Sequence, residues 1–173
     1  MRYAKSAVAA LTCALVMLPA GAAHAGSGPA APSAQPAPSA TAPSPEGNPL
    51  SPRAKAAGVC PDARQIGATA YVDRNGAHIA SVKQFYSPQC QENYAYLWVW
   101  QSYRDVTPSY DVGLGVYSYD RDAVLGTVSA KGTHQQEFWS RGTDTVRECT
   151  SALGAVRTPG DPLADQARTE KRC

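Results

Sequence analysis

The fold of this chain is decided by one ten-residue stretch, YAYLWVWQSY at positions 94–103. Successive side chains of a β-strand point to opposite faces. One face would carry the aromatic residues Tyr94, Tyr96, Trp98 and Trp100. The other face would carry Ala95, Leu97 and Val99. Because both faces are apolar, the pattern predicts a central strand that is covered on both sides.

The aromatic row has two interpretations. If the row is exposed, Tyr94, Tyr96, Trp98 and Trp100 are candidate binding residues for sugar rings or a protein partner. If it is buried, the same side chains form the core. A domain this small needs its tryptophans inside, and exposed apolar rows are rare on monomers, so the core interpretation is favoured.

The flanking sequence predicts further strands separated by turns. Short β-prone runs occupy residues 68–73, 77–86, 110–119, 123–130, 137–140 and 145–149. Asn75-Gly76 is typical of a hairpin turn, because both residues tolerate positive φ. About seven short strands predict an all-β fold, a small antiparallel sandwich or barrel stabilised by disulfides. Residues 151–156 are expected to form a short helical turn.

The first 25 residues have the pattern of a secretory signal peptide. Arg2 and Lys5 precede an apolar run at 7–18, and Ala23-His24-Ala25 is a small-x-small cleavage site. Cys13 lies inside the run, and the residues before it make a poor lipoprotein box, so no lipid anchor is expected. The pattern predicts a secreted protein, either extracellular or associated with the cell wall, with no stable membrane insertion.

Composition divides the rest of the chain into three parts. Residues 26–56 are rich in Ala, Pro and Ser and hold no aromatic residue, which predicts a disordered linker. All aromatic residues beyond the signal lie between Tyr71 and Trp139, so the β domain is placed at 57–156. Residues 157–173 are expected to be a charged, mobile tail.

Four cysteines remain after the signal: Cys60, Cys90, Cys149 and Cys173. An even number in an exported chain predicts two disulfides, with three possible pairings. In a hairpin of the strands at 68–73 and 77–86, Cys60 and Cys90 would lie side by side, which favours this pair and leaves Cys149 with Cys173. The alternative is a free thiol at Cys149, with Cys173 bonded to another chain.

Charge and motif content exclude several function classes. Without Arg2 and Lys5, basic and acidic side chains balance, so no nucleic-acid or anionic-membrane footprint is present. Arginine outnumbers lysine and alanine is abundant, which suggests a bacterial genome of high GC content. His78 and His134 lack a second metal ligand at a usual spacing, and Asp120-Arg121-Asp122 is typical of a turn rather than a calcium loop.

No catalytic motif is found in the sequence. There is no Gly-x-Ser-x-Gly, and no serine is singled out as partner of a histidine. Glu92, Glu137 and Glu148 could serve as glycosidase carboxylates only at a suitable separation, which the sequence does not give. No enzyme activity, cofactor or metal is therefore expected.

Residues 57–154 resemble the YjfA-like family of small secreted bacterial proteins of unknown function. The resemblance is carried by Cys60-Pro61, by the stretch 79–90 that ends in Tyr86-Ser87-Pro88-Gln89-Cys90, by Asn93-Tyr94-Ala95 and by Cys149. Tyr94 stands where tryptophan is usual. The resemblance implies a compact secreted β domain and implies no activity.

These observations predict a secreted, non-enzymatic binding or interaction domain. Its partner would be an extracellular protein or a cell-wall glycan. One alternative is an extracellular protease inhibitor that uses the loop at 87–90. Another is a carbohydrate- or wall-binding module that uses the aromatic row, and an unrecognised hydrolase is a third. The sequence gives no prediction of oligomeric state.

Overall fold

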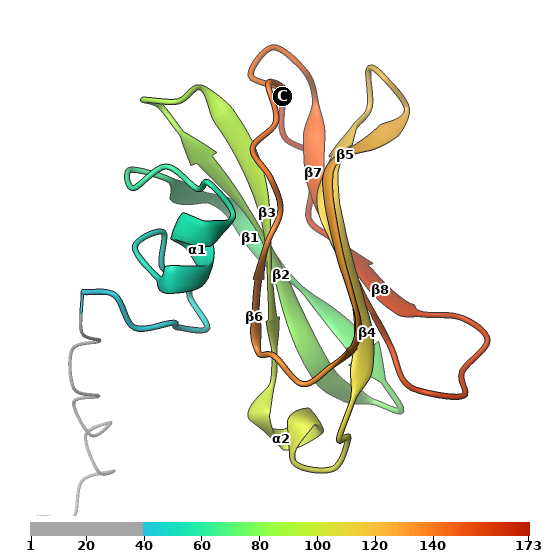
Figure 1. The fold of residues 1–173 in the computed structure, drawn as a ribbon. Coiled ribbons are helices and arrows are strands. Elements are labelled where there is room, and N and C mark those ends of the chain that lie inside the picture. The colour runs from blue at the N-terminus through green and yellow to red at the C-terminus, as the bar shows by residue number, and fades with distance from the viewer. Residues whose placement is uncertain (1–39) are drawn as a thin grey trace, which may run out of the picture. The chain divides into compact units, whose positions relative to one another are not determined.

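A computed structural model describes residues 40–173, so the predicted signal peptide at 1–25 and the first part of the predicted linker lie outside the described residues. Eight strands form two four-stranded antiparallel sheets, with strand orders β1-β2-β3-β6 and β5-β4-β7-β8 (Figure 1). The predicted antiparallel sandwich is confirmed. The strands are β1 (Arg64–Arg74), β2 (Ala77–Ser87), β3 (Glu92–Val99), β4 (Tyr110–Ser118), β5 (Ala123–Thr133), β6 (Glu137–Trp139), β7 (Thr150–Arg157) and β8 (Asp165–Arg168).

Strand β3 lies inside the first sheet and is buried on both faces, as its sequence predicts. Its inner residues Ala95, Leu97 and Val99 join the core between the two sheets. Its outer residues belong to a second cluster, the outer core, formed by Ala54, Val59, Ala63, Phe85, Tyr94, Tyr96, Trp98 and Trp139. The short helix α1 (Pro52–Ala56) lies on the outer side of this sheet, opposite the second sheet (Figure 1).

The predicted linker is wrong in its last part, because the chain before residue 57 packs against the domain. Ser51 caps α1 by accepting a hydrogen bond from Ala54 N at 3.0 Å, and Pro52 stands at the start of the helix. Ser51 Oγ also donates to Glu137 Oε1 at 2.7 Å. The segment has no aromatic residue of its own, but its small side chains cover the aromatic face of the sheet.

The residues from 44 to 63, called here the N-terminal segment, pack closely against the first sheet, and this close approach requires a glycine at position 47. Gly47 has φ of +89°, and a Cβ built on it would lie 2.5 Å from the ring of Phe85. Beside it, the hydroxyl of Tyr96 donates to the carbonyl oxygen of Ser44 at 2.5 Å. The segment from residue 44 onward is therefore part of the folded domain.

The hairpin turn between β1 and β2 is confirmed. Asn75 and Gly76 have φ of 51° and 79°, and Arg74 pairs with Ala77 across the turn. The predicted strand at 94–103 ends earlier than expected, because residues Gln101–Arg104 form a short helix, α2. Apolar alternation continues to Trp100, but the helical turn then redirects the chain to the second sheet.

The C-terminal region differs most from its prediction. Residues 151–156 belong to strand β7 rather than a helical turn, and the strand expected at 145–149 is absent from the described structure. The tail contains β8, which pairs with β7, so it is not a free tail. Pairing with β4 outweighs the local helix preference of this segment. Gly154 lets the sheets approach, since a Cβ there would lie 2.6 Å from Val82.

Both expected disulfides are present. Cys60 bonds to Cys90 with a Cα–Cα distance of 6.4 Å, and Cys149 bonds to Cys173 with a Cα–Cα distance of 4.0 Å. The first links the N-terminal segment to the turn after β2, and the second fixes the end of the chain to the start of β7. In the described part of the chain no helix is long and apolar enough to cross a membrane.

Candidate functional site

The aromatic row on β3 is mostly interior, so the interpretation of it as an exposed binding row is wrong. Tyr94 and Tyr96 are fully buried and Trp98 is nearly so. The rings of Tyr96, Phe85 and Trp139 contact one another in the outer core. Trp100, at the end of the row, is the exception: it is only partly buried. The physical reason is the N-terminal segment, which covers the face that the row presents.

The buried tyrosine hydroxyls have structural partners. Tyr94 donates to Glu92 Oε2 at 2.6 Å and accepts a hydrogen bond from Cys60 N at 3.3 Å. Burial, and then the neighbouring Glu92, raise the pKa of Tyr94 well above its usual range. Burial likewise raises the pKa of Tyr96, assisted by the charge of Glu137. Both hydroxyls therefore stay protonated and serve as donors.

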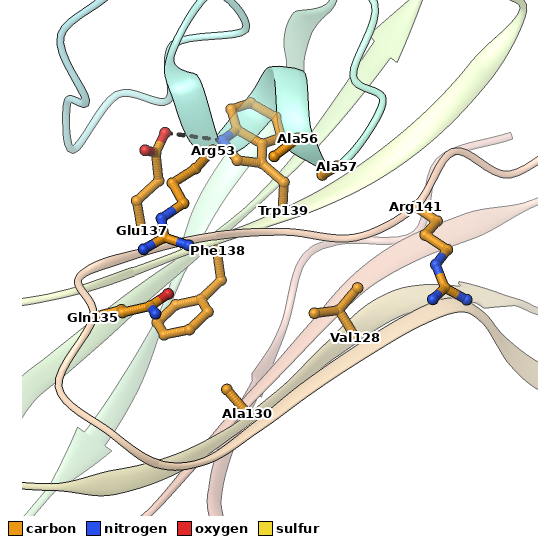
Figure 2. A pocket seen from close by; sticks show the side chains of 10 residues that line it. All are labelled: Arg53, Ala56, Ala57, Val128, Ala130, Gln135, Glu137, Phe138, Trp139 and Arg141. Atoms are coloured by element: carbon orange, nitrogen blue, oxygen red, sulfur yellow. Dashed lines mark hydrogen bonds between the residues drawn. The ribbon is translucent and has the colours of Figure 1, made fainter.

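A cleft lies between α1, strand β5 at the edge of one sheet and strand β6 at the edge of the other, and Figure 2 shows its lining side chains. Strand β5 has 11 residues, whereas β6, the strand that faces it, has only 3. Beyond β6 the chain meets β5 again, because Arg141 N donates to the carbonyl oxygen of Gly126 at 2.9 Å. The resulting cavity, called here the β5–β6 cleft, has a volume of about 330 Å³ and is lined by Arg53, Ala56, Ala57, Val128, Ala130, Gln135, Glu137, Phe138, Trp139 and Arg141.

The walls of the β5–β6 cleft differ in chemistry. Apolar side chains come from β5, where Val128 and Ala130 are half-buried, and from β6, where Phe138 lies in the space between the strands (Figure 2). The guanidinium groups of Arg53, from α1, and Arg141, which follows β6, are exposed. Neither arginine forms an ion pair with a described residue.

Glu137 is a buried carboxylate at one wall of the cleft. Its side chain is only 4% exposed. Oε1 accepts hydrogen bonds from Ser51 Oγ at 2.7 Å and from Trp139 Nε1 at 2.9 Å. Oε2 is buried and has no hydrogen-bond partner among the described residues. A buried carboxylate oxygen without a donor is costly, and because Oε2 is enclosed it is not presented to a ligand in the cleft.

The turn after β2, proposed from the sequence as an inhibitory loop, is exposed and firmly held. Asp62 accepts hydrogen bonds from Ser87 Oγ at 2.5 Å and from Gln89 N at 2.9 Å. The hydrogen bond from Ser87 is the main reason that the pKa of Asp62 lies below its ordinary value. The Cys60–Cys90 disulfide holds the same turn. Gln91 closes the turn with φ of 54°, so the backbone is bent and not extended.

The residues considered for catalysis do not come together. Glu137 pairs with Trp98 near the end of β3, whereas Glu92 begins that strand. Six residues of strand separate them by about 20 Å, beyond the spacing of glycosidase carboxylates. Glu148 instead accepts a hydrogen bond from Ser118 Oγ at 2.5 Å and pairs with Arg121.

The two histidines and the potential metal ligands also have structural partners. His78 pairs with Asp73 and stacks on Tyr71 at 4.3 Å between ring centroids. His134 Nε2 lies 3.0 Å from the carbonyl oxygen of Arg104. The one group of potential metal ligands among residues 40–173 is Cys60, Cys90 and Glu92. Its two sulfur atoms are joined to each other, so they supply no thiolate.

Comparisons with family models, with curated proteins and with solved structures found no match. The resemblance to the YjfA-like family therefore stays a prediction. Sequence reasoning singled out Glu137 only as one of three carboxylates, and it did not find the β5–β6 cleft. Arg53 falls in the predicted linker, yet its helix lies against β6, as the hydrogen bond between Ser51 and Glu137, 86 positions apart in the sequence, shows. No local pattern signals such a contact.

Proposed function

We propose that this chain is an exported, non-enzymatic binding domain and that the β5–β6 cleft is its ligand site. Export is supported by the signal-peptide pattern at 1–25. The two disulfides are compatible with an oxidising compartment outside the cytoplasm. A binding role is favoured because the carboxylates and histidines considered for catalysis have separate structural partners.

The observation that carries the proposal is the composition of the cleft. An apolar floor is flanked by two arginines that have no carboxylate partner among the described residues. Its volume of about 330 Å³ is at the lower end of the range of small-ligand sites. Such a cleft suits an apolar group that carries a negative charge nearby. Among the predicted partners, this chemistry favours an extracellular protein segment with an apolar and an acidic side chain over a neutral glycan.

The ligand site is tested with an aromatic anion as probe. Anilinonaphthalene sulfonate is titrated into the mature chain, residues 26–173, with disulfides intact, and its fluorescence is recorded. We expect saturable binding that weakens about threefold to tenfold for each of Arg53→Gln and Arg141→Gln, because each removes one charged contact. Arg147→Gln is the matched control, since Arg147 is exposed and does not line the cleft. Equal binding by the double variant R53Q/R141Q and the unchanged chain would contradict the assignment.

Export is tested separately. The full sequence is expressed in a Gram-positive bacterial host, and the protein in the medium is identified by N-terminal sequencing. We expect mature protein that begins at Gly26, with four oxidised cysteines. Accumulation inside the cell with residues 1–25 still attached would contradict export while leaving the cleft assignment open to its own test.

The protease-inhibitor alternative is favoured by one observation, the bracing of the β2–β3 turn by Asp62 and the Cys60–Cys90 disulfide. Its bent backbone counts against it, since a peptide that adds to a sheet edge must be extended. Inhibition assays with secreted serine proteases decide the point. Inhibition that is lost in Gln89→Pro but kept in the double variant R53Q/R141Q would assign function to the turn instead of the cleft.

A further inference from the structure

A second, smaller pocket lies on the outer face of the first sheet. It has a volume of about 150 Å³ and is formed where the outer faces of β1 and β2 meet Trp100 and the segment at 45–46. The side chains that define it are Glu46, Thr69, Tyr71, Ser81, Lys83 and Trp100. None of these lines the β5–β6 cleft, so the inference does not depend on the function proposed for that cleft.

Two hydrogen-bond donors in this pocket lack acceptors. The Ser81 side chain is only 1% exposed, and its Oγ has no hydrogen-bond partner among the described residues. The indole Nε1 of Trp100 is likewise buried without an acceptor. Buried polar groups in folded proteins are nearly always paired, so two orphans in one small pocket indicate a missing acceptor.

A lysine in the same pocket lacks a counter-ion. Lys83 is 9% exposed and forms no ion pair with a described carboxylate. Burial lowers the pKa of Lys83, whereas the charge of Glu46 opposes that shift. Because Glu46 is exposed and is not within ion-pair distance, the ammonium group gains only a weak offset for its lost hydration.

The register of the sheet explains why these groups converge. Ser81 and Lys83 are two residues apart on β2, so their side chains point to the same face about 6.6 Å apart along the strand. Tyr71 pairs with Ser81 from the neighbouring strand β1. On the other side, Trp100 N donates to the carbonyl oxygen of Ile79 at 2.9 Å, which holds the indole beside β2.

We propose that this pocket binds the carboxylate group of a small ligand. A carboxylate brings one negative charge and two oxygens that can accept several hydrogen bonds, which matches one ammonium, one hydroxyl and one indole N–H. A neutral sugar would satisfy the hydroxyl and indole groups but would leave the ammonium without a counter-ion. The volume restricts the ligand to a small acid or to one carboxyl end of a larger molecule.

Nuclear magnetic resonance provides the test, because each of the three tryptophans contributes one indole N–H signal. Acetate is titrated into the mature, oxidised chain, and acetamide serves as the neutral probe of the same shape. We expect the Trp100 indole signal to shift with acetate in the millimolar range, while the signals of Trp98 and Trp139 stay in place. Acetamide is expected to shift it at least tenfold more weakly.

Variants assign the effect to the pocket. Lys83→Met keeps an unbranched side chain, one heavy atom shorter, and removes its charge, and we expect the apparent acetate affinity to fall tenfold or more. Ser81→Ala is expected to weaken binding about threefold to tenfold. Lys131→Met is the control, because Lys131 is exposed on β5. If Lys83→Met fails to fold, Ser81→Ala and the acetate–acetamide comparison still decide the outcome.

Three results would overturn the proposal. One is the absence of any Trp100 shift with acetate. Another is an equal shift with acetate and acetamide, which would show that ordered water or any hydrogen-bonding solute satisfies the orphan groups. The third is a shift with N-acetylglucosamine and none with acetate, which would make this a glycan site.

Discussion

The two open sides of the sandwich are closed in different ways. On one side, β1 of the first sheet meets β8 of the second, and Arg74 joins them by pairing with Asp161 at 2.6 Å and Asp165 at 2.8 Å. On the other side, the long β5 faces the short β6, and a cleft remains. Arginines occur on both sides. Arg74 at the closed side is neutralised by carboxylates, whereas Arg53 and Arg141 at the open side have no such partner among the described residues.

This contrast separates structure from candidate function within one fold. Ion pairs and strand contacts at the β1–β8 side stabilise the sandwich. At the β5–β6 side, the apolar surface and the guanidinium groups of Arg53 and Arg141 remain accessible to a ligand.

The largest expected effect is the loss of unfolding free energy on substitution in the core, and it should exceed the loss on substitution at the open side. Leu97 is fully buried between the sheets, so Leu97→Ala should cost about 2–5 kcal/mol of unfolding free energy. Val128 is half-buried at the cleft, and Val128→Ala should cost less than about 1 kcal/mol. Urea denaturation with the disulfides intact measures both. Similar losses for the two variants would mean that the β5–β6 side is as well packed as the core.

The next largest expected effect is the loss of stability on removal of the Cys149–Cys173 disulfide, which should act mainly at the closed side. It spans 24 residues of sequence separation, and its removal in the double variant C149S/C173S should cost about 2–4 kcal/mol. Because this bond fixes the segment that follows β8, hydrogen exchange should accelerate in β8 more than in β5 or β6. Uniform acceleration in all three strands would show that the bond acts on the whole domain rather than on this side.

A smaller effect is expected from acid at the closed side. Arg74 is the main reason that the pKa of Asp161 lies below its ordinary value of 3.8. The folded carboxyl therefore binds its proton less readily than the unfolded one, so its contribution is complete above pH of about 4 and is lost as the pH falls further. Arg74→Met should remove part of this acid sensitivity. Thermal unfolding between pH 3 and pH 7 measures it, and Arg53→Gln, at the open side, is the control that should leave the profile unchanged.

Much of the fold could be predicted because the β signals are local. The alternation at 94–103 indicated a strand buried on both faces, and Asn75-Gly76 indicated a hairpin whose strands bring Cys60 near Cys90. The wrong prediction of a helical turn at 151–156 has a physical cause. Residues 151–156 have a weak local preference, and their conformation is set by pairing with β4.

The candidate site could not be predicted, because it depends on contacts between distant segments. Composition placed Arg53 in a disordered linker, yet the capping by Ser51 and the hydrogen bond to Glu137 fix its helix beside β6. The aromatic row illustrates the same limit. The pattern on β3 showed that a face is apolar, but only the folded chain shows that residues before 64 cover it.

Whether the open side is a ligand site is tested by a map of backbone amide shifts in residues 26–173 during titration with anilinonaphthalene sulfonate. We expect shifts confined to α1, β6 and the 128–130 part of β5, with the β1–β8 side unchanged. Shifts centred on the β1–β8 side, or spread evenly over the domain, would contradict it.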